Sequence, residues 1–366
     1  MKESISLILF PSNRLGGAEK VLSYIGKHIS TNRQVIFVFI SKKQDSHWLE
    51  TEYPQITFSN NREVVGFVKL IFFLLRIRRK YKIDNMYSSL THLNGLLGFY
   101  RAVGILKCNK LICRESTNIF ERFKGIKLTR FKLFYTIGYS KIDLLICQTN
   151  HMQEQLVNSF KKAKKWKIRV IPNPINLRDA QKKSIEDLEI ELPNPSFIFT
   201  LGRLIKVKDH KTLIIAYSRL AKDFPNIDLV IGGTGNEDAN LRKLIEQLGL
   251  TGRIHLIGNL KNPFPYYRKS ALNVISSTNE GFPNVLLEMM SVGNRCVSTI
   301  CTKAILEIPG IYICDISNSE ELAATMKQAL TEISEKSEIN LLRMREFVKS
   351  RDIQTFMDKV WYYTNS

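Results

Sequence analysis

Two glutamates stand on either side of a chain turn in the stretch STNEGFPNVLLEMMSVG. An apolar run typical of a buried strand precedes the stretch, and helical spacing begins near Asn284. Gly281 and Pro283 break regular structure, so Glu280 lies before the turn and Glu288 lies about one turn into the helix. The N–H groups at such a helix start favour an anion, and a carboxylate is the usual acceptor for ribose hydroxyls.

Cations and glycines follow two other predicted strands. In FTLGRLIKVKDHKTLIIAY, Arg203 and Lys208 lie in a short loop before a helix that begins near Lys211. Two cations at the carboxyl end of a parallel strand suit a diphosphate, although an isolated pair is more often a solvated loop. Gly16 and Gly17 follow the first strand, where they either let backbone N–H groups approach an anion or form an ordinary turn. Together with the two glutamates, these residues predict a nucleoside-diphosphate-sugar site.

Short apolar runs alternate with helical segments along the whole chain, which predicts parallel sheets with crossover helices. The first set of strands is SISLILF, QVIFVFI, DNMYSS, NKLICRES, KIDLLICQT and KIRVIPN. A polar stretch, NLRDAQKKSIEDLEIELPNP, separates it from SFIFTLGR, IDLVIGG, RIHLIG, LNVISS, NRCVSTI and GIYICD. We therefore expect an α/β protein with two Rossmann-like domains facing across a cleft, over residues 1–178 and 190–345. A C-terminal helix, 346–366, is expected to pack back on the first domain.

The charge of the chain is concentrated in its first half. The 366 residues carry a formal net charge of +20, with 31 Lys and Arg against 12 Asp and Glu in residues 1–180 (+19). Such asymmetry suggests that the first half faces an anionic surface, either nucleic acid or the inner leaflet of a membrane. No zinc spacing or RNA-binding signature accompanies it. The six cysteines form no C-x-x-C pair, which is typical of reduced thiols in a cytosolic chain.

An apolar helix with a basic end is predicted over residues 64–82. Its apolar part is shorter than the ~20 residues needed to span a bilayer. It is therefore either a buried helix with a solvated basic end or an interfacial helix on anionic lipid. The membrane-facing cations would be Arg76, Arg78, Arg79, Lys80 and Lys82.

Taken in order, these blocks resemble the retaining glycosyltransferases of family 4, which have the GT-B fold. GGAEKVL resembles that family's N-terminal loop, and LGRLIKVKDHKTLIIAY and the stretch from IDLVIGG to MMSVG resemble its C-terminal domain. Glu280 and Glu288 correspond to its E-x7-E motif. The segment after Gly293 departs from the family's usual Cys-Pro-Ser-Gly-Pro loop.

The resemblance implies a role for each matching residue. Arg203 and Lys208 would bind the donor diphosphate and neutralise the leaving group, Glu288 would hold the ribose, and Glu280 would contact the donor sugar. Transfer would retain the anomeric configuration by a same-face mechanism, with no metal or other cofactor. The donor-binding residues implied are Gly16, Gly17, Arg203, Lys208, Glu280, Gly281, Phe282, Pro283, Asn284, Val285 and Glu288.

Two further segments, SSLTHLNGLLG and CRESTN, resemble a subgroup that builds lipid-linked oligosaccharides. His92 would then be a catalytic or sugar-contacting residue, with a hydrogen-bonded structural histidine as the alternative. Possible acceptor or sugar contacts are His92, Asn94, Arg114 and Glu115.

The expected function is transfer of a hexose or N-acetylhexosamine from a nucleotide-diphosphate sugar, UDP-linked, to a polyprenyl-diphosphate-linked saccharide. The enzyme would lie on the cytoplasmic face of the inner membrane and serve O-antigen or capsule synthesis, without a nucleic-acid partner. The alternative is a non-catalytic carbohydrate-binding or scaffold protein with the same fold. A nucleic-acid binder would leave the motifs of the second domain unexplained, and a GT-B epimerase would not match their order.

Overall fold

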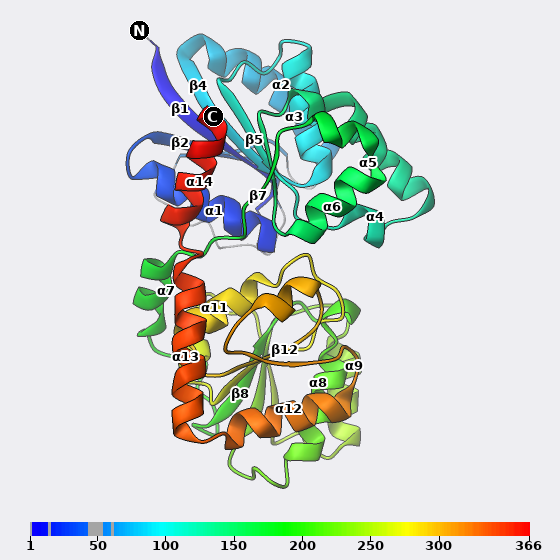
Figure 1. The fold of residues 1–366 in the computed structure, drawn as a ribbon, viewed down its shortest axis with the longest axis vertical. Helices are drawn as coiled ribbons and strands as arrows, with labels where there is room; N and C mark the ends of the chain where they lie inside the picture. Colours follow the sequence, from blue (N-terminus) through cyan, green and yellow to red (C-terminus); the bar gives the residue numbers. More distant parts are fainter. Residues whose placement is uncertain (1, 14–15, 43–53, 60–61) are drawn as a thin grey trace. The chain divides into compact units, whose positions relative to one another are not determined.

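The computed structural model describes residues 2–13, 16–42, 54–59 and 62–366. The chain divides into two compact units, coloured by sequence in Figure 1. Unit 1 comprises Met1–Pro174 and Ile353–Ser366, and unit 2 comprises Ile175–Asp352. The C-terminal segment therefore belongs to the same unit as the N-terminus.

The described part of unit 1 contains a seven-stranded parallel sheet in the order β3-β2-β1-β4-β5-β6-β7. Its strands are β1 Glu3–Ser12, β2 Gln34–Ser41, β3 Gln55–Thr57, β4 Tyr81–Ser89, β5 Lys110–Arg114, β6 Leu144–Cys147 and β7 Ile168–Val170. Its helices are α1 Gly17–Ser30, α2 Glu63–Lys80, α3 Thr91–Ala102, α4 Ile119–Arg122, α5 Gly125–Gly138, α6 Asn150–Ser159 and α14 Ile353–Asn365. The strand order reverses between β1 and β4.

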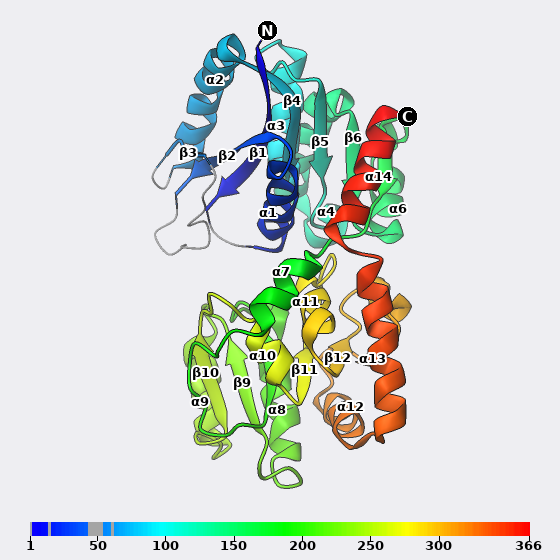
Figure 2. The same ribbon diagram turned by 90° about the vertical axis from the view of Figure 1, so that its left-hand side faces the viewer.

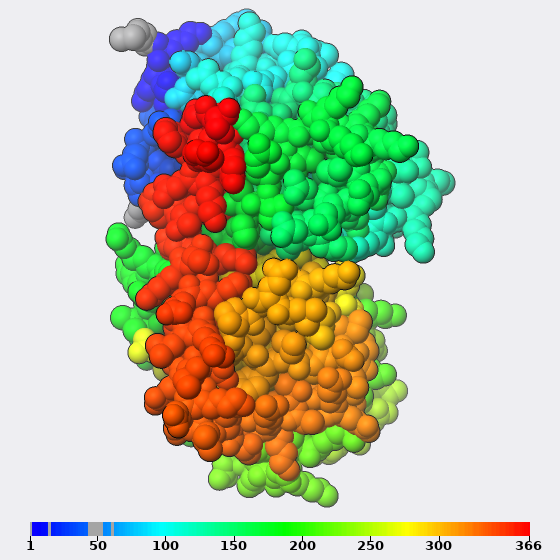
Figure 3. All heavy atoms as spheres, in the orientation of Figure 1, coloured from blue at the N-terminus to red at the C-terminus, as the bar shows by residue number. Residues whose placement is uncertain are grey.

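Helices cover both faces of this sheet, as Figure 2 shows. Alternate residues of β1 point to opposite sides: Leu7 and Leu9 join the core under α2 and α3, whereas Ile8 and Phe10 join the core under α1 and α14. This alternation explains why the strand is a continuous apolar run. The outer side of α14 forms part of the surface of unit 1 (Figure 3).

Unit 2 contains a six-stranded parallel sheet in the order β10-β9-β8-β11-β12-β13. Its strands are β8 Phe197–Leu201, β9 Asp228–Gly232, β10 Ile254–Gly258, β11 Leu272–Ile275, β12 Cys296–Thr299 and β13 Tyr312–Cys314. Its helices are α7 Leu177–Ser184, α8 His210–Leu220, α9 Asp238–Gln247, α10 Phe264–Lys269, α11 Asn284–Val292, α12 Ser319–Thr331 and α13 Ser334–Lys349. Here the strand order reverses between β8 and β11.

The structure differs from the sequence expectations in three local details. The polar stretch expected between the domains contains α7, whose Ala180 is buried against the core that includes α10 and α11. Helix α2 ends at Lys80, so Lys82 lies in β4 and not on the helix. Strand β3 was not predicted, because its three residues at the sheet edge carry no apolar run.

In the described ranges, every helix is too short or too polar to cross a bilayer.

Candidate active site

The predicted donor residues of unit 2 follow the two strands at which the strand order reverses. β8 and β11 are neighbours in the sheet. The loop after β8 carries Arg203 and Lys208, and the turn after β11 carries Glu280. In open parallel sheets, ligands bind at the carboxyl ends of the strands beside such a switch point. The fold therefore gathers residues that lie more than 70 positions apart in the sequence.

Hydrogen bonds tie these two loops together. The Thr278 N–H donates to the Val207 carbonyl at 2.9 Å, and the Ser276 hydroxyl donates to the Lys208 carbonyl at 2.9 Å. The loop after β9 approaches closely as well, because a Cβ on Gly233 (φ +125°) would lie 2.0 Å from the Gly202 carbonyl oxygen. Only glycine fits there. These contacts hold together the loops that follow β8, β9 and β11.

Lys208 and Glu280 form an ion pair at this edge, with 2.5 Å between Nζ and Oε1. The Ser277 hydroxyl donates to the same oxygen at 3.0 Å, and the Glu280 N–H donates to the Cys301 carbonyl at 3.0 Å. The two charged side chains are 18% and 20% exposed, so a ligand can reach them. Arg203 is exposed on the same loop, and its side chain has no partner among the described residues. The edge therefore offers two cations to an anionic group.

Helix α11 begins where the sequence predicts, at Asn284, and no side chain caps its start. Phe282 is buried, and the Arg351 guanidinium lies 5.6 Å from its ring centroid. Gly281, Asn284 and Val285 are partly exposed in the same turn. The turn can therefore present backbone N–H groups and the positive end of a helix dipole.

Glu288 lies one turn into α11 and is 2% exposed. The Tyr267 hydroxyl, on α10, donates to its Oε2 at 3.4 Å. The structure therefore places the two glutamates of the motif differently: Glu280 is reachable at the edge, and Glu288 is held inside by neighbouring side chains.

His210, the first residue of α8, was not singled out by the sequence. Its side chain is buried behind the loop that carries Lys208, and neither ring nitrogen has a hydrogen-bond partner among the described residues. Burial, together with the Lys208 cation, lowers its pKa to about 4. The ring is therefore neutral near pH 7 and adds no positive charge to the edge.

In unit 1, the residues predicted for donor binding follow β1 at its switch point. Gly16 precedes the first turn of α1, and Gly17 is exposed as its first residue. A Cβ on Gly16 would lie 2.5 Å from an oxygen of Glu19, whose carboxylate belongs to the same turn. The Glu19 side chain could move to admit a Cβ at Gly16, whose φ is −118°, so the backbone does not require glycine there. Glu19 also brings a negative charge to the helix start.

The second strand at this switch point, β4, leads into α3 with His92 and Asn94. His92 lies between the rings of Phe67 and Phe134, at centroid distances of 6.3 and 6.4 Å, and burial lowers its pKa. The alternative was a hydrogen-bonded structural histidine, but among the described residues the ring has no hydrogen-bond partner and packs against aromatic rings. Asn94 is fully buried, where it accepts from Ser88 and donates to the Arg114 carbonyl.

Glu115 lies in a buried polar cluster at the end of β5. Thr91 donates to its Oε2 at 2.8 Å, and Tyr139 donates to its Oε1. Burial raises the pKa of Glu115 to about 7, against the opposing effect of these hydrogen bonds. Both carboxylate oxygens therefore have partners inside the unit.

Arg114 extends this cluster toward β7. Its Nη2 donates to Asn173 at 2.5 Å, Asn173 donates to Gln148, and Gln148 donates to the Glu115 carbonyl. The guanidinium is 1% exposed, and its Nε and Nη1 have no partner among the described residues. Burial lowers its pKa to about 10.

Sequence reasoning missed Thr91, Tyr139, Gln148 and Asn173. Gln148 and Asn173 come shortly after apolar strands, and that position could have indicated them. Tyr139 gave no such signal, because it belongs to a short 3₁₀ helix after α5. Within the described ranges, no three His, Cys, Asp or Glu side chains are grouped as a metal site. That transfer needs no metal stays a prediction.

The sequence of this chain is similar to those of known glycosyltransferases. Residues 182–340 match the family model for glycosyl transferases group 1. An uncharacterized glycosyltransferase of Methanocaldococcus jannaschii is 30% identical over 259 residues, which are 68% of this chain and 64% of the relative. A Campylobacter jejuni enzyme, N-acetylgalactosamine-N,N'-diacetylbacillosaminyl-diphospho-undecaprenol 4-alpha-N-acetylgalactosaminyltransferase, is 29% identical over 78% of this chain and 77% of its own length.

The structure of Anabaena HepE in complex with UDP and glucose resembles this chain over 98% of both lengths, with a TM-score of 0.80 and 18% identity. Sucrose-phosphate synthase of Thermosynechococcus elongatus resembles it with a TM-score of 0.76 and 15% identity. These similarities confirm the expected α/β class and GT-B fold. Residues 182–340 therefore match a group 1 glycosyltransferase domain within a chain of GT-B fold, and these similarities indicate a transferase enzyme.

Proposed function

We propose that this glycosyltransferase moves a hexose or N-acetylhexosamine from a UDP-sugar to a polyprenyl-diphosphate-linked saccharide in cell-surface polysaccharide synthesis. The observation that carries the donor half is the reachable Lys208–Glu280 pair at the switch point of unit 2, beside Arg203 and the start of α11. Cations and the N-terminal end of a helix at one sheet edge suit a diphosphate.

In this mechanism, the C1–O bond to the diphosphate breaks, and the electron pair stays on the departing oxygen. Arg203 and Lys208 stabilise that negative charge. The acceptor hydroxyl attacks from the same face, and its proton passes to the departing phosphate oxygen, so the configuration at C1 is retained. Glu280 orients Lys208 through their ion pair and contacts the donor sugar. Glu288 holds the ribose.

The acceptor half rests on relatives. The Campylobacter enzyme is named for a diphospho-undecaprenol-linked acceptor, and other relatives are named for lipopolysaccharide synthesis in Rhizobium meliloti and Salmonella typhimurium. An acceptor of this class is embedded in a membrane. We infer the cytoplasmic face of the inner membrane as the working place of this chain.

Helix α2 supplies the surface for such a membrane. Val64, Val68 and Phe72 recur every four residues and are 75%, 51% and 68% exposed, and Arg76 continues the same stripe. Exposed apolar residues beside cations are typical of an interfacial helix. The amino ends of β1 and β4 adjoin a hollow of about 650 Å³ whose lining includes six cationic and no acidic residues: Lys2, Arg78, Arg79, Lys82, Arg101 and Lys107.

The donor half is tested by comparing Glu280→Gln with Glu288→Gln. Loss of a ribose contact should weaken ground state and transition state alike, so Glu288→Gln should raise the KM for the donor. Glu280→Gln should mainly lower kcat. The assay is transfer from UDP-glucose, UDP-galactose, UDP-N-acetylglucosamine and UDP-N-acetylgalactosamine to a polyprenyl-diphosphate-linked saccharide.

Equal, small effects of both substitutions would contradict these roles. If the wild-type protein neither transfers nor hydrolyses any of the four donors, the non-catalytic carbohydrate-binding alternative gains support. Chromatography of the released nucleotide, with and without acceptor, separates transfer from hydrolysis. The anomeric configuration of the product, read by NMR, tests retention independently.

A further inference from the structure

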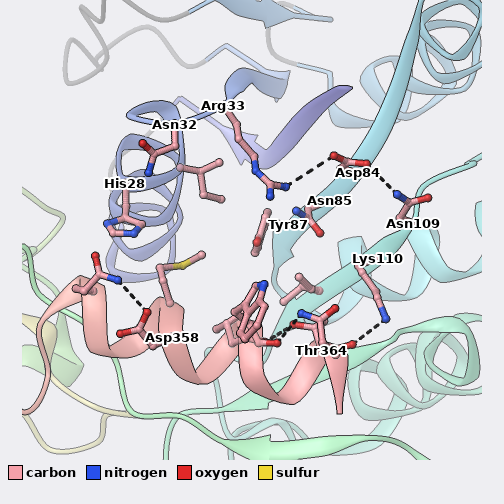
Figure 4. A pocket seen from close by; sticks show the side chains of 17 residues that line it. His28, Asn32, Arg33, Asp84, Asn85, Tyr87, Asn109, Lys110, Asp358 and Thr364 are labelled. Atoms are coloured by element: carbon pink, nitrogen blue, oxygen red, sulfur yellow. Dashed lines mark hydrogen bonds and ion pairs between the residues drawn. The ribbon is translucent and has the colours of Figure 1, made fainter. Parts of the chain in front are cut away.

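A hollow of about 480 Å³ opens on unit 1 beside the central residues of β4 and the first residues of β5 (Figure 4). The end of α1 and one side of α14 complete its lining. The residues predicted for sugar transfer follow the carboxyl ends of the strands, and none of them lines this hollow. The hollow is therefore separate from the residues at the switch point of unit 1.

Helix α14 has one face in the core and one face toward the hollow. Phe356 and Val360 are buried against the sheet and α1. Seven residues of α14 line the hollow: Gln354, Met357, Asp358, Val360, Trp361, Thr364 and Asn365. Four of them, which recur at helical spacing, are polar or aromatic: Gln354, Asp358, Trp361 and Asn365. The polar face is thus not simply the solvated side of a surface helix, because it closes one wall of a concave site.

Tyr87 is the most informative residue of the lining. Its side chain is 4% exposed, and its hydroxyl has no hydrogen-bond partner among the described residues. The hydroxyl is not among the sealed, unpaired polar atoms of the described chain, so it keeps access to the hollow that the residue lines. Figure 4 shows Tyr87 next to Asn85 and between Arg33 and α14. Burial raises its pKa, so the hydroxyl remains a donor at neutral pH.

The lining carries both signs of charge, which argues against a simple ion. Arg33 lies 3.7 Å from Asp84, and Lys110 donates to the Thr364 carbonyl. Asp358 accepts from the Gln354 amide. Two carboxylates disfavour a phosphate, and the cations disfavour a metal ion. The other polar and aromatic groups are side-chain amides, the Tyr87 and Thr364 hydroxyls, the His28 imidazole and a 69% exposed indole. The aliphatic lining is Ile29, Ile112, Met357 and Val360.

These groups match a neutral, polyhydroxylated ligand. Side-chain amides and carboxylates offer donors and acceptors to neighbouring hydroxyls, and an aromatic face can cover the apolar C–H face of a sugar ring. We propose that this hollow is a second, non-catalytic site for a neutral oligosaccharide, with Trp361 beneath a sugar ring and Tyr87 donating to a sugar oxygen. This goes beyond the proposed function, because the site takes no part in transfer.

The test is a titration of the full chain labelled with 5-fluorotryptophan and followed by ¹⁹F NMR. The three tryptophans give three signals, and Trp361→Phe assigns one of them. Maltose and N,N′-diacetylchitobiose are the probes. We expect at least one of them to shift the Trp361 signal saturably at millimolar concentration and to leave the other two signals in place.

Two variants and a matched control sharpen the result. Tyr87→Phe keeps the buried ring and removes only the hydroxyl, and should weaken saccharide binding about tenfold, the effect of one hydrogen bond at 1.4 kcal/mol per decade. Saturation-transfer NMR should lose its sugar signal with Trp361→Ala and keep it with Tyr362→Ala. Tyr362 is the matched control, because it is an equally exposed neighbour on α14 that does not line the hollow.

The proposal is overturned if neither disaccharide gives a saturable shift, or if Trp361→Ala and Tyr362→Ala behave alike. It is also overturned if sodium pyrophosphate moves the Trp361 signal and the sugars do not, which would indicate an anion site. Lys208→Ala should leave the titration unchanged, and Tyr87→Phe should leave transfer unchanged. Failure of this site is therefore distinguishable from failure of the proposed function.

Discussion

The carboxyl edges of the two sheets carry similar residue types in opposite states. In unit 2, Lys208 and Glu280 are about one-fifth exposed, and their charges meet at the edge. In unit 1, Arg114 and Glu115 are 1% and 2% exposed, and the Glu115 carboxylate is occupied by Thr91 and Tyr139. The charged pair of unit 2 thus stays within reach of solvent, and the described cluster of unit 1 is occupied by hydrogen bonds inside the unit.

Burial has opposite consequences for the titratable groups behind the two edges. It raises the pKa of Glu115 in unit 1 to about 7 and lowers the pKa of His210 in unit 2 to about 4. Both shifts favour the neutral form, because a low-dielectric surrounding penalises charge. The units also differ outside their edges, since residues 1–180 carry +19 of the total of +20.

The largest effect is expected from removing charge from unit 1. Glutamine at Arg76, Arg78, Arg79, Lys80 and Lys82 should reduce co-sedimentation with anionic vesicles by orders of magnitude, because each cation near the leaflet contributes about 1 kcal/mol. Binding should also fall with salt. The triple variant of Arg76, Arg79 and Lys80 should account for most of the loss, because Arg78 donates to the Gly104 carbonyl and Lys82 lies beside Asp84.

The control removes five exposed lysines from unit 2: Lys211, Lys222, Lys243, Lys261 and Lys269. This variant should sediment like wild type. If the variant that replaces the five cations of unit 1 also sediments like wild type, α2 serves only to pack in the core. If wild type ignores anionic vesicles, the membrane proposal fails and a water-soluble acceptor takes its place.

The next largest effect is expected from removing cations at the carboxyl edge of the unit 2 sheet. Arg203→Ala and Lys208→Ala should each lower kcat/KM by roughly 10²-fold or more, the scale of a lost charge contact in a transition state. Lys206→Ala is the control, because Lys206 is exposed in the same 3₁₀ turn. Activity should persist in excess EDTA. A strict requirement for added divalent metal would contradict the role given to the two cations.

A smaller effect, on stability, is expected at the carboxyl edge of the unit 1 sheet, where Glu115 is buried. Tyr139→Phe leaves a Glu115 oxygen without its partner, which should lower the free energy of unfolding by about 1–3 kcal/mol. Residues 175–352, which form unit 2, contain no tryptophan, and Trp166 and Trp361 belong to unit 1, so tryptophan fluorescence in urea does not report on unit 2 and follows unit 1. The kcat/KM of the folded enzyme should change little. A large loss of transfer at unchanged stability would instead favour contact between this cluster and the acceptor.

The smallest effect is a pH dependence. The pKa of Glu115 is higher in the folded chain, at about 7, than its ordinary value of 4.5. Its contribution to stability is therefore complete below about pH 4.5 and is lost as the pH rises through 7. The slope is at most about 1.4 kcal/mol per pH unit for one proton. Unfolding of unit 1 by urea should become easier from pH 5 to pH 8 in wild type and less so in Glu115→Gln.

Stability that is unchanged by this substitution across the pH range would show that Glu115 is ionised without penalty. His210→Asn, in unit 2, should leave the fluorescence transition of unit 1 in place at both pH values. This control variant thereby separates the titration of Glu115 in unit 1 from that of His210 in unit 2.

The sequence by itself determined the strands and the ends of the elements that carry the site. All twelve predicted strands are present, because a strand buried on both faces must be a continuous apolar run. The start of α11 at Asn284 follows from glycine, proline and helical spacing, which act over a few residues. Helix α8 begins at His210, one residue before the predicted Lys211, and the Asp209 side chain caps it. The fold class and the enzyme class followed from the order of these local signals, and both are confirmed.

Only the tertiary structure decided which side chains meet and which are buried. The partners Lys208 and Glu280 lie 72 positions apart, and Tyr139 reaches Glu115 across 24 positions. Sequence periodicity carries no information on such distances, because packing of whole elements sets them. For the same reason, the sequence could not foresee that His92 lies between phenylalanine rings, that Lys82 leaves the basic helix, or that α14 closes the wall of a hollow with Trp361.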